Sequence, residues 1–353
     1  MKKTGLVLVV LSLMLVLFAC SGRTRLKVYM PTEYIDEALV EAFEDAFEVR
    51  VDIIPFDSNE SAIPQIEANV YDVIVPSDYA IEELVSKGLL EEIDWTQITE
   101  MDKDTDLDDG LIGILDTLKS GTDGFNLLKY GVPYFWGNVG ILYNTETVDL
   151  AFLQTENWNA LRSFSHKVMF YDSSRDSFMI ALKQIGVATS VNSATEQQIL
   201  DAENWLKATG PNTQFLTDEV LDDMLHPAKH DMAVTYSGDA VYLMSENEKL
   251  DYYVPTTGTN VWLDAFVVPK NAKEKELAYA FINFMVSYES MLANTIEIGY
   301  TSPRADVIAE IIETETYDAE SYVIVVREID EVFRFNSVLK SLIEQAWARV
   351  RSS

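Results

Sequence analysis

One aspartate interrupts the apolar run from Asn260 to Pro269. Alternate side chains of a β-strand point to the same face, so Trp262, Asp264 and Phe266 would share one face of such a strand. A carboxylate between two aromatic rings needs a partner, because desolvating an unpaired charge costs several kcal/mol or raises its pKa until it is neutral. The pattern therefore indicates an acid that requires a cationic partner.

Other aromatic and acidic residues lie at expected turns and strand ends. Together with Trp262 and Asp264, the set comprises Tyr34, Tyr79, Trp136, Asp176, Tyr236, Asp239 and Tyr300. Aromatic faces attract cations by roughly 0.5–2 kcal/mol per good contact, and carboxylates form charge-assisted hydrogen bonds with ammonium groups. A flexible cation with amine ends and a methylene middle would use both. Each aromatic alone is more commonly a core residue, so the joint placement carries the interpretation.

Catalytic and metal-binding patterns are weak. The only cysteine is Cys20, and no Gly-x-Ser-x-Gly motif accompanies the three histidines. His226 and His230 are spaced for one helix face, but Pro227 opposes a helix through both and no third ligand is obvious. The acids at 102, 104 and 106 fail as a calcium loop, because the later glycine and glutamate are missing. No metal or cofactor is predicted, while a secreted glycosidase stays open because any two acids could meet in a cleft.

Strands and helices alternate along the chain, which is typical of βαβ units with a parallel sheet. Strands are expected at 26–30, 50–55, 71–75, 166–171, 232–236 and 260–269, with extended segments from 131 and at 252–255. Helices are expected across 35–47 and at 62–68, 78–88, 176–185, 195–208, 274–287 and 338–350. Open parallel sheets bind ligands beyond the carboxyl ends of their strands, so the turns at 31–34 and 76–79 are candidate binding turns.

The N-terminus has the pattern of an export signal. A charged start is followed by an apolar segment that ends at Cys20, and this junction resembles the bacterial lipobox. We expect a signal peptide at 1–19, a lipidated tether at 20–25, and a protein anchored at Cys20 in the bacterial periplasm or on the cell surface. An ordinary signal peptide that happens to end near a cysteine is the alternative.

Composition limits the possible partners. The 353 residues carry a formal net charge of −32, which excludes nucleic acid as a partner and would attract small cations. Solubility alone would also explain such an acidic surface. The length exceeds what one core usually serves, so two domains are expected.

Several motifs after Leu26 together resemble the spermidine/putrescine-binding proteins, the extracytoplasmic receptors of polyamine ABC transporters. They are Thr32-Glu33-Tyr34, Asp57-Ser58-Asn59-Glu60, Tyr71-Asp72-Val73-Ile74-Val75-Pro76-Ser77, Pro133-Tyr134-Phe135-Trp136-Gly137, Trp262-Leu263-Asp264, Pro269-Lys270-Asn271-Ala272-Lys273 and Ile298-Gly299-Tyr300. The resemblance implies an α/β, two-lobed periplasmic-binding-protein fold with crossing hinge segments and a ligand cleft. We expect an N-terminal lobe from 26–131 and 261–303, and a C-terminal lobe from 132–260 and 304–353.

The resemblance also implies a site and partners. The ligand-binding residues would be Thr32, Tyr34, Ser77, Tyr79, Asp172, Asp176, Tyr236, Asp239, Trp262, Asp264 and Tyr300. Asp264 would hold an ammonium group, Trp262 would lie against the methylenes, and Asp176 and Asp239 would supply charge in the second lobe. We expect a monomer that makes and breaks no bond and delivers a polyamine to a membrane permease. A protein of the same fold that binds an amino acid, a sugar or iron is the alternative.

Three positions depart from the family pattern. Pro31 stands where a tryptophan is general, and Phe333 stands where a glutamine is common. Ser173 replaces an aspartate of spermidine-type members, although the neighbouring Asp172 could substitute for it. Asp239 matches an acid of putrescine-type relatives. A lost carboxylate at one end and a gained Asp239 would favour putrescine over the longer spermidine.

Overall fold

The structure is a computed structural model that describes residues 23–120, 124–186, 191–210, 212–216, 224 and 229–352. The predicted signal peptide, Cys20 and the first residues of the tether lie outside these ranges, as does His226 of the proposed histidine pair.

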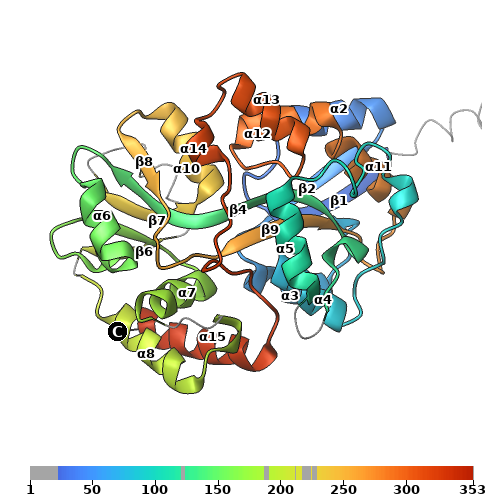
Figure 1. Cartoon of the computed structure of the whole chain (residues 1–353). Helices are drawn as coiled ribbons and strands as arrows, with labels where there is room; N and C mark the ends of the chain where they lie inside the picture. Colours follow the sequence, from blue (N-terminus) through green and yellow to red (C-terminus); the bar gives the residue numbers. More distant parts are fainter. Residues whose placement is uncertain are drawn as a thin grey trace, which may run out of the picture.

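Nine described strands form one sheet in the order β2-β1-β3-β9-β4-β7-β5-β6, with β8 paired to β4 (Figure 1). They are β1 (Arg25–Pro31), β2 (Arg50–Phe56), β3 (Val73–Ile74), β4 (Gly131–Asn144), β5 (Val168–Tyr171), β6 (Thr213–Leu216), β7 (Met232–Tyr236), β8 (Leu250–Tyr253) and β9 (Val261–Val267). Both ends of the sheet are parallel, since β1 pairs with β2 and β3, and β5 pairs with β6 and β7. The middle strands β9 and β4 are antiparallel to their neighbours.

Strand β4 joins the two parallel parts. Its first residues pair with β9 and its later residues pair with β7 and β8. Figure 1 shows it running through the middle of the molecule. We call β1, β2, β3 and helices α2 (Glu37–Phe47), α3 (Asn59–Ala68) and α4 (Asp78–Ser86) the first half. The second half consists of β5, β6, β7 and helices α7 (Ser174–Gln184), α8 (Glu196–Lys207) and α15 (Ser337–Arg351).

Helices lie around this sheet (Figure 1). They are α2 (Glu37–Phe47), α3 (Asn59–Ala68), α4 (Asp78–Ser86), α5 (Asp109–Ser120), α6 (Leu150–Glu156), α7 (Ser174–Gln184), α8 (Glu196–Lys207), α10 (Ser237–Glu246), α11 (Lys275–Met285), α12 (Tyr288–Ile298), α13 (Ala305–Glu313), α14 (Ala319–Tyr322) and α15 (Ser337–Arg351). Short 3-10 helices lie at Trp95–Gln97, Leu127–Lys129, Asn157–Arg162 and Val191–Ser193. The closing helix α15 packs against α7 and α8.

The predicted α/β class is confirmed by this alternation of strands and helices. Most predicted elements appear within a few residues of their expected ends. The pattern missed β6 and helices such as α5, α10 and α12. Phe47, the last residue of α2, is 44% exposed although it is apolar.

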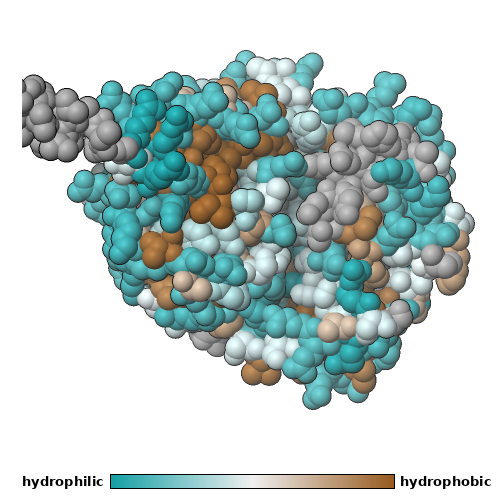
Figure 2. All heavy atoms as spheres, turned by 180° about the vertical axis from the view of Figure 1, so that it is seen from behind, coloured by the Kyte–Doolittle hydropathy of each residue, from teal (hydrophilic) through white to brown (hydrophobic). Residues whose placement is uncertain are grey.

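Hydrophilic residues cover most of the face shown in Figure 2. Among the described helices none is both long and apolar enough to cross a membrane.

Ion pairs of α4 connect the halves away from the central strands. Arg334 contacts Glu82 of α4 at 2.7 Å, and Lys340 of α15 contacts Glu83 at 2.8 Å. The segment that carries Arg334 is fixed to the second half, because its backbone N–H donates to the side chain of Asn192. These contacts hold α4 against the second half.

Candidate functional site

A cavity of about 280 Å³ lies where strand ends of both halves meet. The structure brings all of the predicted site residues to its lining, namely Thr32, Tyr34, Ser77, Tyr79, Asp172, Asp176, Tyr236, Asp239, Trp262, Asp264 and Tyr300. That these residues bind a ligand stays a prediction.

Backbone elements explain why these distant residues meet. Thr32 and Tyr34 directly follow β1, and Ser77 lies between β3 and α4. On the other side, Asp176 lies in the first turn of α7, where the hydroxyl of Ser173 caps the helix by accepting a hydrogen bond from its backbone N–H. Tyr236 ends β7. The cavity therefore lies at the carboxyl ends of parallel strands, as expected for an open α/β sheet.

Strand β9 supplies Trp262 and Asp264 from one face. Close packing holds the indole in place, since a Cβ added to Gly137 of the neighbouring β4 would lie 2.8 Å from its ring. Tyr300 has a similar constraint, because a Cβ on Gly238 would lie 2.2 Å from its ring. Both glycines are required by close approach of an aromatic side chain, a use that their sequence positions do not reveal.

Asp264 is a buried carboxylate with only part of its hydrogen-bonding capacity used. Oδ2 accepts a hydrogen bond from the hydroxyl of Tyr34 at 2.8 Å. Oδ1 is buried and accepts none from the described residues. Burial raises the pKa of Asp264 to about 6, and the neighbouring Ser77 and Tyr34 hydroxyls offset this only in part. The ionised carboxylate thus lacks a counter-charge.

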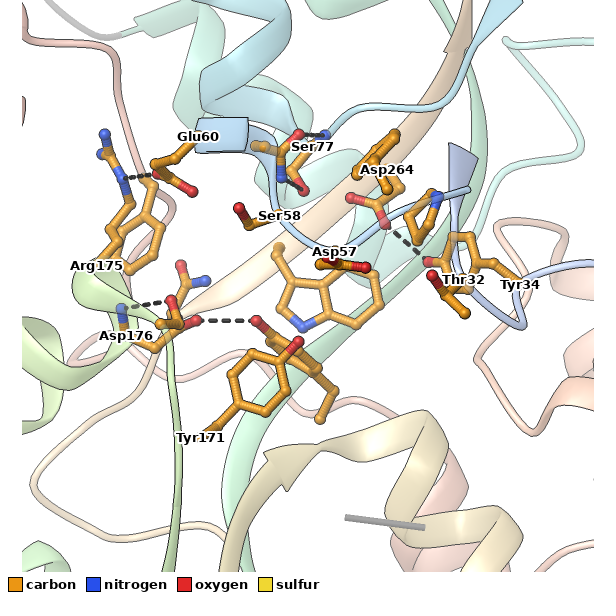
Figure 3. A pocket seen from close by; sticks show the side chains of 18 of the residues that line it. Thr32, Tyr34, Asp57, Ser58, Glu60, Ser77, Tyr171, Arg175, Asp176 and Asp264 are labelled. Carbon is orange, nitrogen blue, oxygen red and sulfur yellow. Dashed lines mark hydrogen bonds and ion pairs between the residues drawn. The ribbon is translucent and has the colours of Figure 1, made fainter. Parts of the chain in front are cut away.

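Asp176 repeats this arrangement on the other side of the cavity. Its Oδ2 accepts from the hydroxyl of Tyr236 at 2.9 Å, whereas its buried Oδ1 has no hydrogen-bond partner within the described ranges. Burial raises the pKa of Asp176 to about 6, and the hydroxyls of Ser173 and Tyr236 oppose this. The charge of Glu60 raises the pKa further, while the positive charge of Arg175 lowers it. Figure 3 places Asp176 and Asp264 on opposite sides of the cavity.

Asp239 differs because both of its oxygens have donors. The hydroxyl of Tyr300 donates to Oδ1 at 2.7 Å, and that of Thr235 donates to Oδ2 at 3.3 Å. Burial raises the pKa of Asp239 to about 6. This residue adds negative charge near the cavity without an unpaired oxygen.

Asp172 lines the cavity, but its carboxylate is engaged by the closing helix. Its Oδ1 accepts from the indole of Trp347 at 3.1 Å, and its Oδ2 lies 3.1 Å from the guanidinium of Arg351. The substitution of Asp172 for the missing acid at Ser173 is therefore not favoured by the geometry.

Aromatic rings form a continuous row along the cavity. Tyr34 meets Tyr300 at 5.1 Å between ring centroids, Tyr300 meets Trp262 at 5.5 Å, and Trp262 meets Tyr236 at 5.7 Å. Tyr171, which the sequence analysis missed, extends the row through its contact with Tyr236 at 5.2 Å. Rings of this kind offer apolar surface to methylenes and electron-rich faces to cations.

Glu60 and Arg175 are further lining residues that the sequence analysis did not single out. The Arg175 guanidinium lies 4.0 Å from the ring centroid of Tyr79 and 5.3 Å from that of Phe333. Its Nε is 3.8 Å from Glu60 (Figure 3). Glu60 also accepts a hydrogen bond from the Tyr79 hydroxyl. Arg175 thus occupies the ring faces of Tyr79 and Phe333 and pairs with Glu60 at this end of the cavity. The quoted motif that contains Glu60 was the only sequence signal for it.

Trp136, the remaining aromatic of the sequence set, lies outside the lining of the cavity. It is buried, and its indole donates to the carbonyl of Ser302 at 3.0 Å. Its role is structural, which is the usual role of a tryptophan in a core.

Comparisons with known proteins show which family this chain resembles. A family model described as bacterial extracellular solute-binding protein matches residues 38–320. The spermidine/putrescine-binding periplasmic protein of Escherichia coli is 27% identical over 280 residues, which cover 78% of this chain and 76% of that protein. The putrescine-binding periplasmic protein SpuD of Pseudomonas aeruginosa is 26% identical over 300 residues, 79% of this chain and 78% of its own. A solved structure from Listeria monocytogenes, assigned to spermidine/putrescine ABC transport, has a TM-score of 0.80 and 30% identity, and covers 93% of this chain and 99% of that one.

Proposed function

This chain belongs to the bacterial extracellular solute-binding proteins, and we propose on that basis that it is a polyamine receptor of an ABC importer, with putrescine as its preferred ligand. The cavity would close around the ligand, and the closed form would be presented to a membrane permease. The protein itself would make and break no bond.

One observation carries the proposal. The cavity holds two buried carboxylate oxygens on opposite sides, and neither accepts a hydrogen bond from the described residues. An ammonium group at each oxygen would satisfy both, since charge-assisted hydrogen bonds are strong where water is excluded. Trp262 lines the same cavity in contact with Tyr236 and Tyr300, and would contact the methylenes. Putrescine, with two amines, matches two unpaired acids better than spermidine with three.

Other ligands of this fold fit the cavity less well. Tyr34, Tyr236 and Tyr300 each donate their hydroxyl hydrogen to an aspartate. Burial raises the pKa of all three phenols well above the usual value, which opposes the phenolate form that ferric iron binds. Arg175, which could bind an anion, is engaged by Glu60 and two rings. A cation therefore suits the unoccupied acids better than an anion does.

Calorimetric titration of the protein lacking residues 1–20 tests the proposed function. Putrescine, spermidine, spermine, basic amino acids and sugars should be compared under one condition. We expect saturable binding of polyamines, tightest for putrescine, and no product after prolonged incubation. Absence of heat with every polyamine would end the proposal, and turnover of a glycoside would favour the hydrolase alternative.

Ligand affinity should fall as the pH falls below about 6. In the empty cavity the pKa values of Asp176 and Asp264 are raised to about 6, so both bind protons at lower pH. An ammonium group binds the ionised carboxylate, and protonation therefore competes with the ligand. Titrations between pH 8 and pH 5 should show affinity that is nearly constant above pH 7 and declines progressively below pH 6. An affinity independent of pH over this range would argue against these acids as amine partners.

The ion pair between Glu82 and Arg334 should favour the closed state, because it joins the two halves. We expect Glu82→Gln to weaken putrescine binding a few-fold through faster dissociation, as partly exposed pairs contribute about 1 kcal/mol or less. High salt should reduce the difference from wild type. Arg50→Gln is a matched control, since Arg50 of β2 pairs with Glu44 of α2 inside the first half. Equal dissociation rates in wild type and Glu82→Gln at low salt would contradict this role.

Membrane attachment forms a separate part of the proposal. We propose that Cys20 carries a lipid and that residues 20–25 form the tether to the membrane. Mass spectrometry of membrane-extracted protein would test this, because an unmodified Cys20 at the mature N-terminus would exclude the anchor.

A further inference from the structure

Asn260 presents a buried acceptor to the same cavity, although no motif in the sequence singled it out. Its side chain lines the cavity, and the residue is 2% exposed. Its Oδ1 accepts no hydrogen bond from the residues that the structure describes. An amide carbonyl that is buried without a donor is unfavourable and rare in folded proteins, so a donor is expected from outside the protein.

The backbone fixes where this amide lies. Asn260 directly precedes β9, and its backbone carbonyl accepts a hydrogen bond from the N–H of Val139 in β4 at 3.3 Å. It also forms a parallel bridge with Glu331. The residue is therefore held in extended conformation and continues the alternation of β9.

Alternation places Asn260, Trp262 and Asp264 on one face of this segment, and all three line the cavity. With a rise of roughly 3.3 Å per residue, positions 260 and 264 are about 13 Å apart. Subtracting one charge-assisted contact of roughly 2.8 Å at each end leaves about 7 Å between two bound nitrogens. A short linear diamine spans that distance, with its methylenes over Trp262.

We infer that Asn260 is a ligand-binding residue whose amide oxygen accepts a hydrogen bond from the second ammonium group of a short linear diamine, shared with Asp176, while Asp264 holds the first. This inference rests on the proposed function, since it concerns the same cavity and ligand. An ammonium group has three N–H donors, so it can serve the carboxylate and the amide together. The neutral amide adds a directed acceptor without adding repulsion between acids.

Three variants at position 260 and one double-mutant cycle between Asn260 and Asp176 test the inference. The readouts are putrescine affinity and thermal unfolding of the empty protein. Asn260→Leu removes the acceptor at similar size, and we expect putrescine affinity to fall about tenfold or more. Asn260→Asp keeps an acceptor at the same place and should bind at least as tightly as wild type at pH 8. Asn260→Ser, which shortens the side chain, should weaken binding even if the leucine variant fails to fold.

The cycle with Asp176 asks whether the two residues share one ammonium group. In an Asp176→Asn background we expect Asn260→Leu to weaken putrescine by no more than about twofold, because neighbouring groups that share a partner are not additive. A full tenfold loss of putrescine affinity in that background would show that Asn260 and Asp176 do not share one ammonium group. Wild-type affinity in Asn260→Leu or Asn260→Ser, or equal loss in Asn260→Asp, would overturn the role of Asn260. Failure of the wild-type protein to bind any polyamine would instead remove the proposed function.

Discussion

Replacing Asp264 by asparagine will weaken putrescine binding by roughly 30-fold to several-thousand-fold, because removing one partner of a buried charge pair costs about 2–5 kcal/mol. Asparagine has nearly the same size and can still accept from the Tyr34 hydroxyl. The loss would therefore report the missing negative charge. Isothermal titration at pH 7.5 measures it directly, and an affinity within a few-fold of wild type would mean that the first ammonium group is held elsewhere.

The same substitution should have the opposite effect on the stability of the empty protein. The pKa of Asp264 is raised to about 6 by burial, so ionisation at pH 7 opposes folding. The stabilising contribution of the protonated carboxyl is present below its unfolded pKa and is lost as the pH rises through about 6. We expect Asp264→Asn to gain on the order of 1–3 kcal/mol at pH 7, and the gain should disappear near pH 4. Thermal unfolding of the ligand-free protein at the two pH values checks the sign, and a lower stability at pH 7 would show a structural defect.

Asp176 and Asp172 both lie at the other end of the cavity, but we expect their replacement by asparagine to have very different effects on putrescine affinity. Asp176→Asn should weaken putrescine by a factor similar to that of Asp264→Asn, because its Oδ1 is buried and unpaired within the described residues. Asp172→Asn should change the affinity by less than about threefold, because that carboxylate is directed to Trp347 and Arg351. Its partly exposed ion pair should contribute at most about 1 kcal/mol to stability.

Titration of both variants with putrescine and spermidine provides the comparison. Equal losses in the two variants would mean that Asp172 leaves α15 when the ligand binds. A loss confined to Asp172→Asn would reverse the assignment of the two acids.

Local sequence patterns were sufficient for the class of fold and for much of the cavity. The expected membership in the polyamine-receptor family and the two-lobed fold are both confirmed by the comparisons. Part of the cavity could be predicted because parallel strands bring their carboxyl ends to one edge of the sheet. Residues just after a strand can therefore be assigned to a shared site without knowing the sheet order. Tyr34 and Ser77 were located by this rule, the family resemblance pointed to Asp176, and alternation located Asp264 beside Trp262.

Contacts between distant segments could not be read from those patterns. The sequence suggested that Asp172 could bind the ligand in place of the acid missing at Ser173. In the structure its carboxylate instead contacts Trp347 and Arg351 of α15, which begins more than 160 residues later. The same holds for Arg175, whose neighbour Asp176 was singled out while its own stacking on Tyr79 was not. Asn260 was overlooked because an amide before a strand carries no charge or aromatic signal. These contacts join residues that are far apart in the sequence, so they become visible only in the folded structure.

The most direct measurement is a crystal structure of the protein lacking residues 1–20, grown with putrescine. The proposed function predicts one ligand in the cavity, with one nitrogen about 3 Å from Oδ1 of Asp264 and the other about 3 Å from Oδ1 of Asp176, and with the methylenes against Trp262. A putrescine bound outside this cavity, or one whose nitrogens avoid both aspartates, would contradict it.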